Sequence, residues 1–162
     1  MADRELTHID EAGEAHMVDV GDKAVTRRVA VAEGVVAMSP DLVEKFFSGD
    51  LPKGDAAAVA RVAGILGAKK TAELIPLCHP LPLDSVEISL RRGGHGVTVT
   101  ATVSTTGRTG VEMEAMTAVA TTALTIYDMV KGVERGVTIE AVRLRMKEGG
   151  RTGTWERPEV VD

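Results

Sequence analysis

One largely apolar segment of the chain carries a few ionisable residues at helical spacing. Between about residues 111 and 131, polar side chains recur three or four positions apart. At roughly 100° per residue they share one stripe of a helix. The members of that stripe are Glu114, Thr117, Thr121, Thr125, Asp128 and Lys131. A helix that is otherwise apolar is mostly buried, so the stripe faces a pocket or a polar interface. Carboxylates and an ammonium group there could transfer protons and stabilise charge.

A simpler interpretation needs no chemistry. Asp128 and Lys131 could form an i,i+3 ion pair on a solvated edge, and the threonines could bond back to helix carbonyls. The helix alone does not decide between the two. Glu114 and Asp128 are fourteen residues apart, which is about 21 Å along a straight helix. They cannot touch one reacting atom. Either a long ligand bridges them, or each belongs to a different site that a second subunit completes.

The string Gly-Arg-Thr-Gly occurs twice and could bind anions. The first copy, at 107–110, lies just before the expected helix. Free N–H groups and the helix dipole favour an anion there, and Arg108 adds a guanidinium. Taken alone, such a loop is more often a plain turn and cap. The second copy, at 150–153, contains Arg151 and could be another anion contact or a flexible tail. Of the two, the tail is favoured.

Two loops present single side chains that could take part in catalysis or binding. His79 lies in a Leu-Cys-His-Pro string whose flanking prolines fix its direction, so a presented imidazole is plausible, although a lone histidine is usually structural. Cys78 is the only cysteine and is better explained as a small buried hydrophobe than as a nucleophile. No cluster with metal-ligand spacing surrounds them, so no metal site is predicted. Lys53 lies on a tight Pro-Lys-Gly turn, where most lysines are merely solvated.

Composition limits the classes of function. A chain of 162 residues favours one domain with a core that needs no disulfide or metal. The net charge is −5 and no long basic run occurs, which disfavours a duplex-binding or polybasic membrane surface. One Trp, one Tyr and two Phe offer few stacking platforms for single strands. No stretch is apolar enough to span a bilayer and no signal peptide is evident, so a cytoplasmic location is expected.

The elements that must position these residues follow one order along the chain. Strands are expected near 27–38, 86–91, 97–103 and 137–147, and helices near 40–49, 55–70 and 111–131. Ser39 and Asp55 are the expected N-caps. A bulge is expected at Gly34 and another between Ala141 and Val142. A three-proline segment at 74–83 must be a stiffened loop. The order predicts an α+β, ferredoxin-like split βαβ fold, an antiparallel sheet with helices packed on one face.

The expected domain organisation is simple. Residues 1–24 form a partly ordered N-terminal arm with a strand candidate at 17–20, residues 25–153 form a single catalytic domain, and residues 154–162 form a tail. Small residues recur every four positions in the second helix, at Ala56, Ala60, Gly64 and Ala68. Such a ridge allows close packing, and its partner is expected to be the sheet or a neighbouring subunit.

Four strings together resemble the molybdenum cofactor biosynthesis protein C (MoaC) family. They are Lys53-Gly54-Asp55, the segment from Leu74 to Leu81, the segment from Thr109 to Ala115, and the segment from Ala123 to Met129 followed by Lys131. The likeness begins near Leu6 and extends to about Gly153. Strings of this length in this order are very specific.

The resemblance implies an activity, an assembly and a set of site residues. The family is cyclic pyranopterin monophosphate synthase, which rearranges 3′,8-cyclo-7,8-dihydroguanosine triphosphate and releases pyrophosphate. It implies a homohexamer, a trimer of dimers with sites at the dimer interface, in agreement with the distance argument. The implied catalytic residues are Asp128, Lys131 and Lys53. The implied substrate-binding residues are Leu77, Cys78, His79, Glu112, Met113 and Glu114, with the basic residues Lys23, Arg28, Arg108, Lys147 and Arg151 near the phosphates. Other members can carry Lys at position 108, and Arg there keeps the charge but changes the hydrogen-bond geometry.

The implied reaction needs proton transfer and control of a triphosphate's charge, but no redox step. No electron-carrying cofactor is therefore expected, and Mg²⁺ could accompany the substrate triphosphate. Asp128 and Lys131 are expected to act as a coupled acid/base pair, Lys53 and the basic loops to neutralise phosphates, and His79 and Glu114 to orient the guanine-derived part. Two alternatives stay open: a nucleotide-binding oligomeric module without chemistry, since fold does not fix function, and a purely structural oligomerisation subunit.

Overall fold

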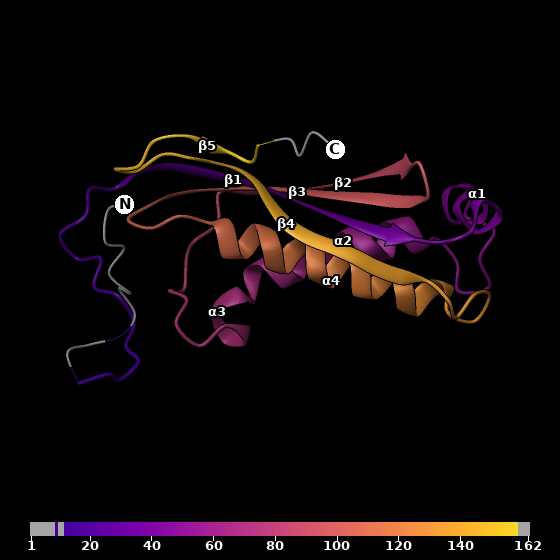
Figure 1. Ribbon diagram of the computed structural model, residues 1–162, viewed down its shortest axis with the longest axis horizontal. Helices are drawn as coiled ribbons and strands as arrows, with labels where there is room; N and C mark the ends of the chain where they lie inside the picture. Colours follow the sequence, from indigo (N-terminus) through magenta and orange to yellow (C-terminus); the bar gives the residue numbers. More distant parts are fainter. Residues whose placement is uncertain (1–8, 10–11, 159–162) are drawn as a thin grey trace.

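The computed structural model describes residue 9 and residues 12–158. Its elements in chain order are β1 (Thr26–Ala37), α1 (Pro40–Ser48), α2 (Ala56–Lys69), α3 (Thr71–Leu74), β2 (Ser85–Gly93), β3 (Gly96–Gly107), α4 (Glu112–Val130), β4 (Thr138–Glu148) and β5 (Trp155–Glu156). The sheet order is β2-β3-β1-β4-β5, and every neighbouring pair is antiparallel. Figure 1 shows α2, α3 and α4 together on one side of the sheet. The predicted split βαβ, ferredoxin-like arrangement is confirmed.

The inner face of the sheet forms the core with α4. In β3, Val97, Val99, Ala101 and Val103 are fully buried, and the alternating threonines lie on the other face. Alternation of this kind is what a strand with one covered face requires. Helix α4 crosses this face and packs on β1, β3 and β4. The long helix that carries the stripe is therefore held along much of its length by the core.

Of the two expected bulges, the one at Gly34 was wrong and the one in the last strand is confirmed close to its predicted position. The β1–β3 register is continuous through Gly34. The glycine instead makes room for α4, because a Cβ atom there would lie 2.6 Å from Val119 Cγ1. Against β1, the β4 register shifts around Glu140 and again around Arg145, so the first irregularity lies one residue before the predicted position. Apolar phase alone locates such a shift only approximately, because the pairing partner decides which residue is left out.

The small-residue ridge of α2 packs within the same chain. Ala56, Ala60, Gly64 and Ala68 are all buried, and the principal contact of α2 is with α4, with fewer contacts to β2. A Cβ atom at Gly64 would lie 2.2 Å from Thr122 Oγ1, and one at Gly67 would lie 2.4 Å from Thr121 Oγ1. The expected partner, sheet or neighbouring subunit, was mostly wrong, because a helix of the same chain fills that place.

The expected caps fix where α1 and α2 begin. Ser39 Oγ accepts a hydrogen bond of 3.4 Å from Leu42 N, and Asp55 Oδ1 accepts one of 2.9 Å from Ala58 N. Both caps are confirmed, and each satisfies an N–H that has no partner inside its helix. The segment between the two helices contains Lys53, in a turn closed by a bond of 2.9 Å from Gly54 N to Leu51 O. Lys53 thus protrudes from a turn anchored at both sides.

The two ends of the chain differ from the predicted strand at 17–20 and the predicted tail at 154–162. Residues 17–20 form no strand, so that candidate was wrong. The described part of the arm contains the isolated bridge Ile9–Ala15 and a turn closed by the bond from Lys23 N to Val20 O. In the predicted tail, β5 pairs with β4 through Trp155 and Lys147. The division into arm, domain and tail stays a prediction, and residues 1–8, 10–11 and 159–162 lie outside the described part. Across that part, no helix has the length and apolar character needed to cross a membrane.

Candidate active site

A cluster of three charged side chains lies at the C-terminal end of α4. Lys53 Nζ lies 2.9 Å from Asp128 Oδ2, and Lys131 Nζ lies 2.8 Å from Asp128 Oδ1. Lys53 Nζ also donates a bond of 2.7 Å to the backbone oxygen of Asp128. We call these three residues the lysine–aspartate cluster. It joins the α1–α2 turn to the last turn of α4, where the free carbonyls and the negative end of the helix dipole favour cations.

The two lysines keep Asp128 ionised. The hydrogen bond from Lys131, followed by the one from Lys53, lowers the pKa of Asp128 to about 2. The same hydrogen bond raises the pKa of Lys131. All three side chains are about half exposed, so this cluster is open to a ligand or a partner surface. The ion pair of the simpler interpretation is present, and so is one of its threonine back-bonds, from Thr125 Oγ1 to Thr121 O.

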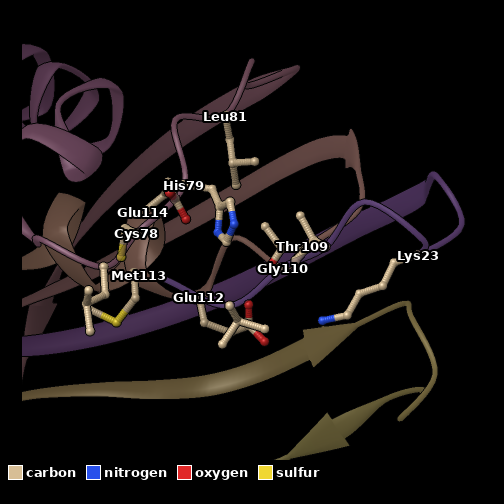
Figure 2. A pocket seen from close by; sticks show the side chains of 12 residues that line it. Lys23, Cys78, His79, Leu81, Thr109, Gly110, Glu112, Met113 and Glu114 are labelled. Carbon is tan, nitrogen blue, oxygen red and sulfur yellow. The ribbon is translucent and has the colours of Figure 1, made fainter. Parts of the chain in front are cut away.

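A cavity of about 350 Å³ lies at the other end of α4. The proline-rich loop forms one wall and the start of α4 forms the other, while the N-terminal arm lies along the edge. The lining residues are Val18, Val20, Lys23, Leu77, Cys78, His79, Leu81, Thr109, Gly110, Glu112, Met113 and Glu114. We call it the histidine-loop cavity. Figure 2 shows His79 and Glu114 directed into the same space, with Lys23 reaching in from the arm.

Glu114 is the most buried ionisable group of this cavity. Only 4% of the residue is exposed, and no ion pair in the described part of the chain involves it. Burial, with a smaller contribution from Glu112, raises the pKa of Glu114 to about 6. Burial also raises the pKa of the Cys78 thiol, and Glu114 adds to that effect. A carboxyl group in such surroundings favours a ligand that donates hydrogen bonds to it.

A second, larger cavity of about 780 Å³ adjoins the first and is rich in arginine. It shares Lys23, Thr109 and Gly110 with the histidine-loop cavity. Its remaining lining residues are Asp19, Asp22, Ala24, Thr26, Arg28, Arg108, Gly150, Arg151 and Thr152. We call it the basic cavity. Since it meets the first at the start of α4, one ligand could occupy both.

Unsatisfied donors make the basic cavity suited to an anion. Arg28 Nε and Thr26 Oγ1 are buried and have no hydrogen-bond partner. Helix α4 begins after Val111, whose side chain does not cap it, and the start of a helix attracts anions. Arg28 is oriented by a bond of 3.3 Å to the Arg108 carbonyl. A phosphate group would satisfy such donors.

The second Gly-Arg-Thr-Gly string folds back over this cavity. Gly150, Arg151 and Thr152 line it, and a Cβ atom at Gly150 would collide with the Arg28 guanidinium. Lys147 does not line the cavity but donates a hydrogen bond to Thr152 Oγ1. The anion contact, which the residues alone disfavoured, therefore agrees better with the structure than a free tail.

The structure gathers the predicted site residues into two groups rather than one. Eleven of the fourteen lie in or beside the two adjoining cavities, and the lysine–aspartate cluster lies at the far end of α4. Val18, Val20 and Leu81 were missed, because apolar side chains carry no chemical signature. The one signal in the sequence was the spacing of Val18 and Val20, two positions apart, which places both side chains on the same side of an extended segment. Leu81 had no such signal. Within the described residues, no three His, Cys, Asp or Glu side chains are grouped so that they could hold a metal ion.

Comparison with known proteins gives a consistent result. A family model described as the MoaC family matches residues 17–150. The chain is similar to a protein named cyclic pyranopterin monophosphate synthase from Corynebacterium efficiens, with 58% identity over 93% of this chain and 97% of that protein. It is also similar to proteins of the same name from Chloroflexus aurantiacus, with 57% identity over 97% and 98%, and from Thermomicrobium roseum, with 56% identity over 96% and 95%.

Proposed function

This chain belongs to the MoaC family, and we propose that it is a cyclic pyranopterin monophosphate synthase of molybdenum cofactor biosynthesis. The observation that carries the proposal is 58% identity, over nearly the whole of both chains, to a protein of that name. The site agrees with it, since an arginine-rich cavity adjoins one that holds a buried carboxyl group and an imidazole.

The substrate of this proposal is 3′,8-cyclo-7,8-dihydroguanosine triphosphate, and the products are cyclic pyranopterin monophosphate and pyrophosphate. The basic cavity takes the triphosphate, with Lys23, Arg28, Arg108 and Arg151 as its positive charges and Lys147 behind Thr152. The histidine-loop cavity takes the guanine-derived part. There Leu77, Cys78, His79, Glu112, Met113 and Glu114 form the contact surface. Arginine forks and free helix N–H groups bind phosphate well because both present several donors to one anion.

The lysine–aspartate cluster supplies the proton chemistry of this proposal. Its pKa shifts leave Asp128 ionised and Lys131 protonated at neutral pH. Lys131 is therefore the group that can donate a proton, and Asp128 holds both ammonium groups in place. As a proton leaves Lys131, Asp128 keeps the remaining charge on Lys53 balanced. Asp128 and Lys131 titrate as a unit, and substrate binding determines the protonation state of the pair during the reaction.

The site needs two copies of the chain. Glu114 and Asp128 are about 21 Å apart along α4, so one chain cannot place the lysine–aspartate cluster over its own histidine-loop cavity. A second protomer supplies the cluster. Exposed apolar residues support such an assembly: α2 presents Val59, Val62 and Leu66 on one stripe, and α4 presents Leu124. The proposed assembly is a homohexamer, a trimer of dimers, with the sites between protomers.

The conversion involves no net oxidation or reduction, so the proposal includes no electron carrier. Mg²⁺ enters it only as a companion of the substrate triphosphate. A cytoplasmic location is part of the same proposal. The competing function is a nucleotide-binding oligomeric module without chemistry. It predicts binding of the triphosphate without release of pyrophosphate.

The deciding experiment incubates the purified protein with the cyclised triphosphate and measures pyrophosphate and the pterin product together. Product formation at equal molar amounts supports the synthase. Tight binding of the triphosphate with no release of pyrophosphate, in the presence and absence of Mg²⁺, would establish the binding module instead. The Asp128→Asn variant is the control for a contaminating nucleotide pyrophosphohydrolase, because such a contaminant would release pyrophosphate from both preparations.

A further inference from the structure

A buried hydroxyl group on β3 connects the two walls of the histidine-loop cavity. Thr105 is 0% exposed, and its Oγ1 donates a hydrogen bond of 2.6 Å to the carbonyl oxygen of Pro82. We propose that Thr105 is a positioning residue that fixes the loop carrying His79 against the wall formed by the start of α4. The effect of Thr105 on catalysis rests on the proposed function, whereas its effect on the geometry of the cavity does not depend on that function.

The loop packs Leu81 and Leu83 against the core, but its backbone makes few hydrogen bonds. Pro76, Pro80 and Pro82 have no N–H to donate. Within the described residues, the backbone donors from Cys78 to Asp84 make one bond inside the loop, from Cys78 N to Ile75 O, and one bond to β3, from Asp84 N to Ser104 O. Thr105 is fully buried, so its hydroxyl needs an acceptor within the protein. Its hydrogen bond to Pro82 O supplies that acceptor and fixes the loop three residues from His79.

The position of Thr105 on β3 ties this contact to the opposite wall. Two residues later the strand ends at Gly107, and the chain continues through Thr109 and Gly110 into α4. Both residues line the cavity with Glu112 and Glu114. Each wall is thus anchored to the same end of β3, one through the continuous backbone and the other through the Thr105 hydroxyl and the bond from Asp84 N to Ser104 O. The Thr105 bond is therefore one of the contacts that set the distance between the walls.

A neighbouring threonine offers a matched control. Thr106 Oγ1 donates 2.9 Å to Asp84 Oδ2 in an exposed contact, and it is adjacent in sequence on the opposite face of β3. The exposed bond of Thr106 exchanges readily with water, whereas the hydroxyl of Thr105 is buried and bonds to Pro82 O within the protein. Removing the Thr106 hydroxyl should therefore leave the loop where it is.

The single cysteine allows the loop to be followed without any assay of activity. Cys78 adjoins His79 and is half-buried. Its reaction with an aromatic disulfide reagent reports how often the loop leaves the wall, since the thiol must reach solvent to attack. In Thr105→Val, which keeps the shape and loses the hydroxyl, the labelling rate of Cys78 should rise by about tenfold, the factor that matches loss of one buried hydrogen bond. Thr106→Val and Thr105→Ser should label at the wild-type rate.

Activity provides the second measurement. With the cyclised triphosphate, Thr105→Val should raise KM by roughly tenfold and change kcat much less, because the loop contributes binding surface to substrate and transition state alike. Thr105→Ser should restore the wild-type KM. If Thr105 had only a structural role, Thr105→Val would lower the melting temperature but would not raise KM selectively over kcat.

Wild-type labelling and wild-type KM in a folded Thr105→Val protein would overturn the proposal. If Thr105→Val does not fold, Thr105→Ser and Thr105→Ala form the replacement pair, which differs by the hydroxyl alone, and equal labelling of both would also overturn it. A wild-type protein that releases no pyrophosphate would count against the proposed synthase and not against the role of Thr105, because the labelling comparison would still decide that role.

Discussion

Two carboxyl groups on one helix have opposite electrostatics. Asp128 lies in water beside two ammonium groups, and its pKa falls to about 2. Glu114 is buried and belongs to no ion pair in the described part of the chain, and its pKa rises to about 6. Opposite charges favour the ionised form, and burial disfavours it. Near neutral pH, Asp128 is therefore a fixed negative charge, and Glu114 is the group whose charge a bound ligand can change.

Asp128→Asn should abolish most of the turnover and leave the fold intact. The amide keeps the shape but cannot balance Lys53 and Lys131, so kcat should fall by about 100-fold or more. The melting temperature should change little, because exposed ion pairs add little stability. Glu73→Gln is the matched control, since it breaks the exposed i,i+3 pair with Lys70. Near-normal turnover in Asp128→Asn would remove this residue from the mechanism.

Glu114→Gln should stabilise the protein above pH 6 but not below pH 4.5. The folded-state pKa is raised to about 6 from an ordinary 4.5. The folded protein therefore binds the proton more tightly than the unfolded chain, and its stability falls as pH rises through this window. Glutamine does not ionise, so the variant does not lose this part of the free energy of unfolding, which is about 1–2 kcal/mol.

The measurement for Glu114 is the free energy of unfolding by denaturant at several pH values. The difference between Glu114→Gln and wild type should grow from pH 4.5 to pH 6 and then stay constant. Glu87→Gln, at an exposed position on β2, should show no such growth. A difference that does not depend on pH would mean that Glu114 is already balanced in the folded protein.

At the scale of elements, the contact between α2 and α4 decides where the site residues lie. Helix α2 follows directly from the turn with Lys53, and α4 carries Glu114 and Asp128 and begins just after the loop that lines the basic cavity. Gly64 and Gly67 let the two helices approach so closely that the threonines of α4 occupy the place of a Cβ atom. Any larger residue must push α4 away, and both ends of the site move with it.

Gly64→Ala should destabilise the protein in spite of alanine's better helix propensity. Overpacking typically costs about 1–3 kcal/mol, and the gain in propensity is at most about 1 kcal/mol. The net loss should be about 1–2 kcal/mol by denaturant unfolding. Gly136→Ala serves as the control, because nothing lies within 4 Å of the added atom and the change should be neutral or slightly stabilising. Equal stability of both variants would show that the helices can separate without cost.

At the scale of the whole molecule, the fold divides the site between its two ends. The lysine–aspartate cluster and the two cavities lie at opposite ends of one rigid helix, which cannot bend enough to bring them together. Exposed apolar residues on α2 and α4 indicate surfaces that another protein would cover. The proposed association between copies of the chain would meet both conditions.

Complementation tests the shared site directly. Lys53→Ala and Glu114→Gln should each have little activity alone. After subunit exchange of equal amounts, about a quarter of the wild-type activity should return, because half of the dimers are mixed and each mixed dimer has one intact site. Two samples of the same variant, mixed in the same way, are the control. No recovery, with exchange verified by a mass tag, would place each site within one chain.

Local patterns in the sequence determined most of the elements and identified the residues. Ser39 and Asp55 predicted two helix starts because a cap depends on a side chain and an N–H a few residues away. The alternation from Val97 to Val103 predicted β3 because one face of a strand repeats every second residue. The four family strings selected Lys53, His79, Glu114 and Asp128. The sequence predicted a bulge at Gly34 and missed its close contact with α4, because the neighbouring residue on α4 is far away along the chain.

Only the tertiary structure decided how those residues are grouped and charged. Lys53 meets Asp128 across 75 positions of sequence, and the basic cavity combines the arm, β1 and two glycine-rich loops. Likewise, the pKa of Glu114 is raised mainly by its burial in the packed protein. The pKa of Asp128 is lowered first by Lys131 on the same helix and then by Lys53, which comes from a distant segment. Spacing along the chain determines what a residue can reach within one turn or one strand. Distances between segments, and so the electrostatics of the site, exist only once the core has packed.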